Sequence, residues 1–288
     1  MSTPAQLVWV ITGTSTGLGR ELARAALARG DKVIATARAR SLAKLDDLKA
    51  AGADVLELDV TAPLDALKAV AGQAVAIHGR VDVVVNNAGY ILTSAIEEST
   101  PQETFEQYNT NVFGALNVSR AFLPYMRKRG TGTVVFIGSL GGWQGGPLAG
   151  LYCSTKWALR GINESLHAEI APLGLRSVCF DFGYFRTSFL TPEHRTPYEP
   201  RIEDYRGVTE EVNTALLAYN EKQPGDPEKG VNVMLDVVRG EGAAAGKPWE
   251  INVQLGSDCL AVVQEHCEKA LKRLSEWEDI TKSTDIKE

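Results

Sequence analysis

The chain has 288 residues, of which 44% are hydrophobic and 23% are charged, and its formal net charge is -6. This profile is typical of a globular protein in water, and an α/β domain can use the whole length as one unit. The mild acidity argues against a nucleic-acid partner, which would need a basic surface. Unpaired cysteine spacing and well-separated histidines favour neither disulfides nor zinc, and indicate a reduced, cytoplasmic setting. We read no signal peptide and no membrane-spanning segment, and so expect no membrane partner.

Short apolar runs alternate with helical patterns along most of the chain. The runs that predict buried strands are residues 7–11, 32–37, 54–60, 81–85, 133–138, 176–182 and 250–255. The patterns that predict helices between them are residues 17–30, 41–51, 64–78, a helix beginning at Thr100, and residues 151–170. Such alternation predicts parallel pairing through right-handed crossovers. The expected fold class is α/β, a doubly wound parallel sheet of about seven strands with helices on both faces.

Two later stretches fall outside this alternation. Residues 184–229 are irregular and contain several prolines and aromatic residues. They predict a substrate lid, because long loops of this kind are commonly binding loops, and a plain surface insertion is the alternative. Residues 258–280 carry apolar side chains at helical spacing and predict a C-terminal helix. We expect its apolar stripe first to pack on its own domain, and second to form a subunit contact.

A glycine-rich turn, Gly13, Gly17 and Gly19, lies between the first predicted strand and helix. Glycines let a pyrophosphate approach the backbone, and the following helix offers free N–H groups. Tight packing is the alternative reading of such a turn.

The end of the second predicted strand indicates which dinucleotide would bind. No acid stands there to bind ribose hydroxyls, and Arg38 follows instead. A guanidinium can hold a 2′-phosphate, and the hydroxyls of Ser15 and Thr16 could add donors. The pattern favours NADP(H). The alternative is that Arg38 is a solvated charge at a helix start.

Tyr152 and Lys156 are the strongest candidates for chemistry. They are four residues apart on a predicted helix, so their side chains share one face. An ammonium beside a phenol favours the phenolate, which would lower the tyrosine pKa from ~10 towards neutrality. Ser139 ends the fifth predicted strand, and Asn111 lies within a predicted helix. Taken singly, these residues could be a surface charge, a strand end and a helix irregularity.

These residues, with the motif Asn86-Asn87-Ala88-Gly89, resemble the short-chain dehydrogenase/reductase family in order and spacing over the first two-thirds of the chain. The resemblance implies a Rossmann-type fold, with residues 1–288 forming a single dinucleotide-binding oxidoreductase domain. It implies hydride transfer between NADP(H) and a carbonyl or secondary alcohol carbon. Tyr152 would be the general acid/base, and Ser139 would orient the substrate oxygen. Lys156 would bind the nicotinamide ribose, and Asn111 would hold a water that links Lys156 to solvent.

The resemblance also implies a set of cofactor contacts. Asp59 would bind the adenine with Val60 beside it, and Thr187 would contact the carboxamide. Phe182 stands where the family has a proline, so the backbone can differ there. The residues expected to bind the cofactor are Gly13, Ser15, Thr16, Gly17, Leu18, Gly19, Arg38, Asp59, Val60, Asn87, Ala88, Gly89, Tyr152, Lys156, Gly183, Phe185 and Thr187.

The substrate is expected to be a small, largely apolar carbonyl or alcohol. Large apolar side chains flank the predicted site, and such residues line pockets but also fill cores. They are Trp143, Tyr184, Phe185, Phe189 and Leu190. Two other functions stay open: a non-redox cyclase or isomerase that uses NADP(H) as a template, and an NADPH-sensing binding protein. The resemblance further suggests a homodimer or homotetramer.

Overall fold

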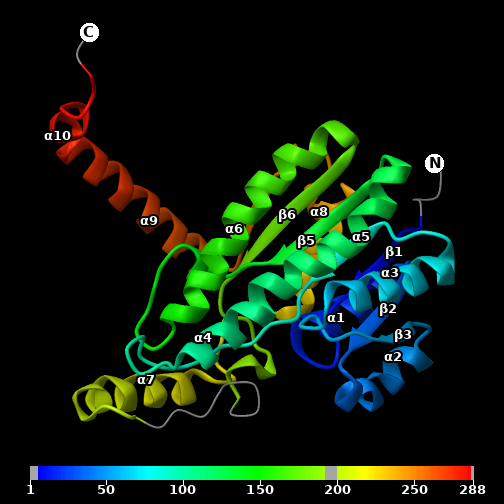
Figure 1. Ribbon diagram of the computed structural model, residues 1–288, viewed down its shortest axis with the longest axis horizontal. Helices are drawn as coiled ribbons and strands as arrows, with labels where there is room; N and C mark the ends of the chain where they lie inside the picture. The colour runs from blue at the N-terminus through cyan, green and yellow to red at the C-terminus, as the bar shows by residue number, and fades with distance from the viewer. Residues whose placement is uncertain (1–5, 192–199, 287–288) are drawn as a thin grey trace.

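The computed structural model describes residues 6–191 and 200–286. Within these residues, seven strands form one parallel sheet in the order β3-β2-β1-β4-β5-β6-β7 (Figure 1). The strands are β1 (Val8–Ile11), β2 (Lys32–Ala37), β3 (Asp54–Glu57), β4 (Val83–Asn86), β5 (Gly132–Ile137), β6 (Leu175–Phe182) and β7 (Asn252–Leu255). The predicted Rossmann-type doubly wound sheet is confirmed. The third strand is shorter than expected, because β3 ends at Glu57 rather than at residue 60.

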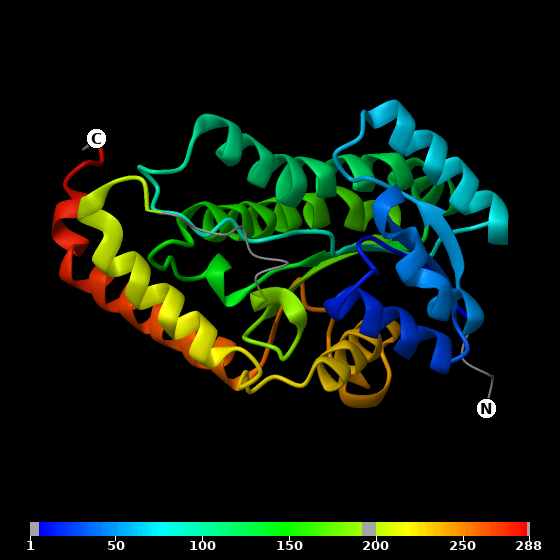
Figure 2. The same ribbon diagram turned by 90° about the horizontal axis from the view of Figure 1, so that it is seen from below.

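Helices cover both faces of the sheet (Figure 2). On one face lie α1 (Gly17–Ala28), α2 (Asp46–Ala50) and α8 (Pro227–Arg239). On the other lie α3 (Leu64–His78), α5 (Ala115–Arg129) and α6 (Gly150–Ile170). The helix predicted from Thr100 is α4 (Pro101–Tyr108), and Thr100 and Glu103 form the expected capping box.

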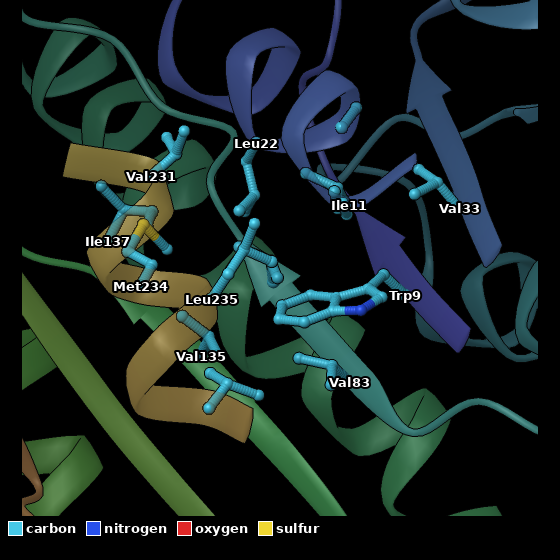
Figure 3. Close-up of a cluster of buried hydrophobic side chains, with 14 of the residues drawn as sticks. Trp9, Ile11, Leu22, Val33, Val83, Val135, Ile137, Val231, Met234 and Leu235 are labelled. Atoms are coloured by element: carbon cyan, nitrogen blue, oxygen red, sulfur yellow. The ribbon is translucent and has the colours of Figure 1, made fainter. Parts of the chain in front are cut away.

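The continuous apolar strands are buried because alternate residues serve opposite faces. In β1, Trp9 and Ile11 pack towards α1 and α8, whereas Val8 and Val10 pack towards α3 and α5. Figure 3 shows the first of these clusters, between the sheet and α1 and α8. Each fully buried side chain of this size contributes ~1.5–3 kcal/mol of hydrophobic stabilisation. The sheet is therefore a rigid base for whatever lies at its carboxyl edge.

Three segments differ from the sequence prediction. Residues 41–51 are not one helix: a 3₁₀ segment, Ala39–Leu45, leads into the short α2. The segment 184–229 was predicted as irregular, but it contains α7 (Arg206–Tyr219); residues 192–199 of it lie outside the described residues. Asn111 lies in a π-helical turn, Asn109–Gly114, between α4 and α5.

The C-terminal helix is present as α9 (Ser257–Glu276), followed by α10 (Glu278–Lys282), and both project away from the sheet in Figure 1. Cys259 at the base of α9 is buried. Farther along, Leu271, Leu274 and Trp277 are 68%, 61% and 56% exposed. The expected packing of the stripe on its own domain is therefore wrong for the outer half of the helix. Among the described helices, none combines the length and apolar character needed to cross a bilayer.

Candidate active site

A cleft of about 1380 Å³ opens where the carboxyl ends of the central strands meet their loops. Open parallel sheets bind ligands at this edge. Most of the predicted site residues line it: Gly13, Ser15, Thr16, Gly17, Leu18, Arg38, Asp59, Val60, Asn87, Ala88, Gly89, Ser139, Tyr152, Lys156, Gly183, Phe185 and Thr187. Gly19 and Asn111 are buried behind this lining. The fold thus brings together residues that are far apart in the sequence.

The glycine-rich turn has the geometry that its residues predict. Gly13 and Gly17 have φ of 70° and 59°, in the left-handed region that favours glycine. At Gly19, a Cβ would overlap the Asn87 amide and lie 2.8 Å from the carbonyl oxygen of Gly13. The N-terminus of α1 lies at the cleft, because its first residues, Gly17 and Leu18, are part of the lining. These residues fit the pyrophosphate of a dinucleotide.

The turn is fixed to the end of β4 through Thr12 and Asn87. The Thr12 hydroxyl accepts N–H bonds from Asn87 and Ala88, both at 3.0 Å. The Asn87 side-chain amide donates to the carbonyl oxygens of Thr12 (2.8 Å) and Gly13 (3.1 Å). The Asn-Asn-Ala-Gly motif therefore braces the two loops that flank the cleft.

Positive charge gathers at the end of the cleft beyond β2. Arg38, Arg40 and Lys44 all line this end. Asp59 also lines it, and its carboxylate accepts bonds from the Thr61 N–H (3.0 Å) and hydroxyl (2.8 Å). Three cations at one end of a dinucleotide cleft suit a phosphate group.

Ser139, Tyr152 and Lys156 converge at the ends of β5 and α6. The hydroxyl of Ser139 is hydrogen-bonded to that of Tyr152, and it accepts the Gly141 N–H at 3.1 Å. The Lys156 ammonium donates to the carbonyl oxygen of Ile137 at 2.6 Å and lies 5.5 Å from the centroid of the Tyr152 ring. Hydroxyl, phenol and ammonium thus form one polar cluster in the cleft.

Burial governs the protonation of this cluster. It raises the pKa of Tyr152 well above its usual range, and the Ser139 hydrogen bond offsets only part of that rise. Burial also lowers the pKa of Lys156 to about 8. The prediction that Lys156 brings the tyrosine pKa down to neutrality is therefore wrong for this geometry, because desolvation is the largest cause of the shift and the Lys156 charge is not among its main causes. A phenol whose pKa is raised keeps its proton at neutral pH.

Asn111 belongs to the same region without facing the cleft. Its amide donates to the carbonyl oxygen of Tyr90 (3.0 Å) and to the Thr155 hydroxyl (3.2 Å), and its oxygen accepts the Tyr90 N–H (3.1 Å). It thereby ties the loop after β4 to α6, next to Lys156. Turns of π-helix recur at functional sites, where they re-aim a side chain.

The apolar wall of the cleft was predicted only in part. Tyr184, Phe185, Phe189 and Leu190 line it as expected, whereas Trp143 lies outside the lining. The sequence analysis missed three residues of α7 that do line it: Val212, Leu216 and Tyr219. The spacing of Val208, Val212, Leu216 and Tyr219 was an available helical signal.

No group of three or more His, Cys, Asp or Glu side chains in the described part of the chain is placed to hold a metal ion. The reactive groups that the cleft offers at the ends of β5 and α6 are the hydroxyl of Ser139, the phenol of Tyr152 and the ammonium of Lys156.

Comparison with known proteins points the same way. Residues 7–197 match the family model described as short chain dehydrogenase. The chain is 32% identical over 280 residues to the oxidoreductase BOA17 of Botryotinia fuckeliana, an alignment that covers 95% of this chain and 97% of that one. A crystal structure of a short-chain dehydrogenase from Streptomyces avermitilis superposes with a TM-score of 0.85 at 34% identity, covering 98% and 99% of the two chains. A variant of the actinorhodin polyketide ketoreductase, solved with NADPH, has a TM-score of 0.72 at 27% identity over 88% of this chain and 97% of its own.

Proposed function

The chain belongs to the short-chain dehydrogenase/reductase family, whose members are oxidoreductases acting on CH–OH and C=O groups, and from that premise we propose that it is an NADPH-dependent reductase of a largely apolar ketone or aldehyde. The reverse reaction would oxidise a secondary alcohol. One observation carries the proposal: Tyr152, which is buried beside Ser139 and whose pKa is raised by that burial, shares a cleft with the glycine-rich turn.

The residues of the cluster would divide the work as follows. When bound, the reduced nicotinamide supplies the hydride that forms the new C–H bond. Tyr152 gives its phenolic proton to the carbonyl oxygen, so that the C=O π bond is replaced by C–H and O–H bonds. Ser139 hydrogen-bonds the same oxygen and stabilises the negative charge that develops on it. Lys156 orients the ribose and reprotonates the phenolate of Tyr152. Asn111 holds the surrounding loops in place and binds a water.

NADP(H) is the favoured cofactor because Arg38, Arg40 and Lys44 surround the end of the cleft where a 2′-phosphate would lie. The ketoreductase relative solved with NADPH supports the same choice. The test is Arg38→Leu, with affinity measured by fluorescence quenching. We expect NADPH binding to weaken at least ~10-fold, because a charge-assisted phosphate bond is lost, and NADH binding to stay unchanged. Equal losses for both cofactors would contradict this assignment.

The substrate side of the cleft favours an apolar carbonyl compound. Phe189 and Leu190 after β6, with Val212 and Leu216 of α7, give it an apolar wall. We therefore propose that residues 184–229 form a substrate lid on the single catalytic domain 1–288, with α7 as its wall. Steroid-like, retinoid-like and polyketide-type carbonyls all fit such a wall.

The decisive experiment follows NADPH oxidation by absorbance across a panel of apolar ketones, aldehydes and quinones. Tyr152→Phe should lower kcat by ~10²–10⁴-fold, because the proton donor is lost, with NADPH binding retained. If NADPH binds but the Phe variant keeps full turnover, Tyr152 is not the acid and the mechanism fails. If no carbonyl is reduced, two other outcomes are informative. Conversion of a substrate without net NADPH oxidation would indicate the cyclase or isomerase. NADPH binding without conversion of any substrate would indicate the NADPH sensor.

We also propose that the chain assembles as a homodimer or homotetramer, with the exposed apolar face of α9 as one contact. Light scattering of the purified chain and of the double variant Leu271→Glu, Leu274→Glu tests this. A monomeric wild type would overturn it. A cytoplasmic location is proposed as well, because Cys153, Cys179, Cys259 and Cys267 are all free thiols.

A further inference from the structure

Asp181, on β6, is a completely buried carboxylate directly behind the loop that carries Ser139. One of its oxygens accepts the indole N–H of Trp143 at 2.8 Å. The other lies against Gly138, where a Cβ would overlap it. The carboxylate therefore fills the space beneath the backbone that leads to the catalytic serine, and glycine at residue 138 makes room for it.

Trp143 connects this carboxylate to the helix of Tyr152 and Lys156. The Arg160 guanidinium lies 3.5 Å from the centroid of the Trp143 ring, and it donates to the carbonyl oxygen of Gly142 at 3.2 Å. His266 of α9 packs edge-on against the same ring at 5.9 Å. The loop from Ser139 to Trp143 is thus fastened to β6 and α6 through one indole ring.

Several titratable groups surround the Asp181 carboxylate. From α6 come Tyr152, Lys156 and Arg160; from β6, Cys179; and from α9, Cys259. Cys179 donates its thiol to the carboxylate at 3.6 Å, and Cys259 donates to the backbone carbonyl oxygen of Asp181 at 3.2 Å. The two cations on this list both belong to α6.

A buried ammonium needs such a carboxylate. Lys156 is only 8% exposed, and burial is the main cause that lowers its pKa. The negative charges of Cys179 and Asp181 act in the opposite direction, and the Asp181 carboxylate is the one of the two that is an ordinary anion. Burial raises the pKa of Asp181 itself, while the Trp143 indole and Arg160 hold that pKa down. The carboxylate acts on the ammonium through its charge at longer range, not as a contact ion pair.

We propose that Asp181 is a positioning residue of the reductase: it anchors the Ser139 loop through Trp143 and acts as the buried counter-charge that keeps Lys156 protonated beside Tyr152. The inference rests on the proposed function where it assigns Lys156 a part in the reaction. The hydrogen bonds and packing of the Asp181 carboxylate do not depend on the proposed function.

Asp181→Asn tests the charge, because the amide oxygen can still accept the Trp143 indole bond. A negative charge favours the protonated form of every neighbouring group, so its removal lowers both apparent pKa values of the coupled Tyr152–Lys156 pair. We expect the alkaline limb of kcat for reduction to move down by at least about one pH unit, because a unit charge within roughly 12 Å shifts a pKa by that much at an effective dielectric of ~20. KM for NADPH should not change.

A second readout needs no turnover. The ε-carbon resonances of ¹³C-labelled lysine report each titration, and Lys156→Met identifies the signal of Lys156. That signal should titrate near pH 8 in the native chain and about one unit lower in Asp181→Asn. An unchanged titration overturns the counter-charge. If the shift is seen but the native chain reduces no carbonyl, the proposed function fails and the inference about Asp181 stands.

Asp31→Asn is the matched control. Asp31 is also buried and also accepts a tryptophan indole bond, from Trp9 at 2.8 Å, but it precedes β2 at the opposite edge of the sheet. Asp31→Asn should leave the pH at which Lys156 titrates unchanged. A shift equal to that caused by Asp181→Asn would refute a local effect of Asp181.

Trp143→Phe tests the anchor separately, and it does so even if Asp181→Asn does not fold. Loss of the indole donor should lower kcat about tenfold or more with NADPH affinity retained, since misplaced reacting groups lose up to ~10²-fold in rate. Unchanged kcat overturns the anchoring role.

Discussion

Replacing Lys156 by methionine should abolish turnover and yet make the folded chain more stable at neutral pH. The side chain is 8% exposed, and its pKa falls from the ordinary lysine value of 10.5 to about 8 because burial penalises the ammonium. Methionine has a similar length and no charge to bury. The prediction isolates the energetic consequence of holding a cation inside the cleft, without reference to any substrate.

The magnitude follows from the pKa shift. A fall of about 2.5 units corresponds to ~3 kcal/mol at ~1.4 kcal/mol per unit. Against this, methionine leaves the carbonyl oxygen of Ile137 without the ammonium that donates to it at 2.6 Å, which costs about 1–2 kcal/mol. The net expectation is a gain of about 1–2 kcal/mol at pH 7, or a rise in Tm of ~3–6 °C.

The pH dependence has a definite sign. Because the folded pKa lies below the unfolded one, the unfolded chain binds more protons between pH 8 and 10.5, and the native chain gains stability from this group as pH rises through that window. The advantage of the methionine variant should therefore be constant below pH 8 and shrink above it. Urea unfolding at pH 7, 8 and 9.5 measures this.

Lys68→Met is the matched control for those unfolding measurements. Lys68 is a lysine on α3 whose side chain is 55% exposed and paired with Asp65. Its replacement should show no such trend with pH. A Lys156→Met variant that is less stable at pH 7, by an amount that does not vary with pH, would refute the reasoning.

Two further predictions concern the walls of the cleft. Gly19→Ala should lower the free energy of unfolding by ~1–3 kcal/mol and weaken NADPH binding, because the new Cβ would overlap the Asn87 amide. The control is Gly161→Ala in α6, where a Cβ meets nothing within 4 Å. It should raise the free energy of unfolding, measured by calorimetry, by ~0.5–1 kcal/mol. Glu103→Gln should lower the free energy of unfolding by ~1 kcal/mol at pH 7, a value reduced for solvent screening because the side chain is 25% exposed. Arg201 lowers the pKa of Glu103 to about 2 in the folded chain. The stability that the ionised Glu103 contributes is therefore present above the unfolded pKa near 4.5 and is lost as pH falls towards 2. The urea midpoints of the native and Gln chains should converge over that acid range, and a difference independent of pH would contradict the pairing.

The sequence predicted the sheet and the contents of the cleft well because both depend on local patterns. A buried parallel strand needs a continuous apolar run, which is visible in the sequence. A close backbone turn needs glycine at fixed spacing, so Gly13 and Gly17 can be identified without any tertiary information. Tyr152 and Lys156 share a helical face by spacing alone. In each case the physical requirement acts on residues that are neighbours in the chain.

What the sequence could not predict depends on contacts between distant segments. Nothing near Asp181 shows that its carboxylate meets an indole 38 residues away. Trp143 was placed in the cleft wall because it is large and apolar, whereas the structure uses its one polar atom. The pKa shift of Tyr152 was predicted in the wrong direction. The prediction considered the charge of Lys156 and left out the loss of solvent around the phenol, which raises the pKa.

Two unfavourable features of this fold lie at the cleft. Leu148, which lines it, has φ of 59° in a region that non-glycine residues rarely adopt, and Lys156 holds a charge in a buried place. At the opposite edge of the sheet, Asp31 pairs with Arg239 and the Trp9 indole, and all its bonds are satisfied there by strong partners. Strain and buried charge survive only where the surrounding structure holds them and selection needs them. Substitutions that relax Leu148 or neutralise Lys156 should therefore raise stability while lowering turnover, whereas substitutions at Asp31 should lower stability first, and activity only through it.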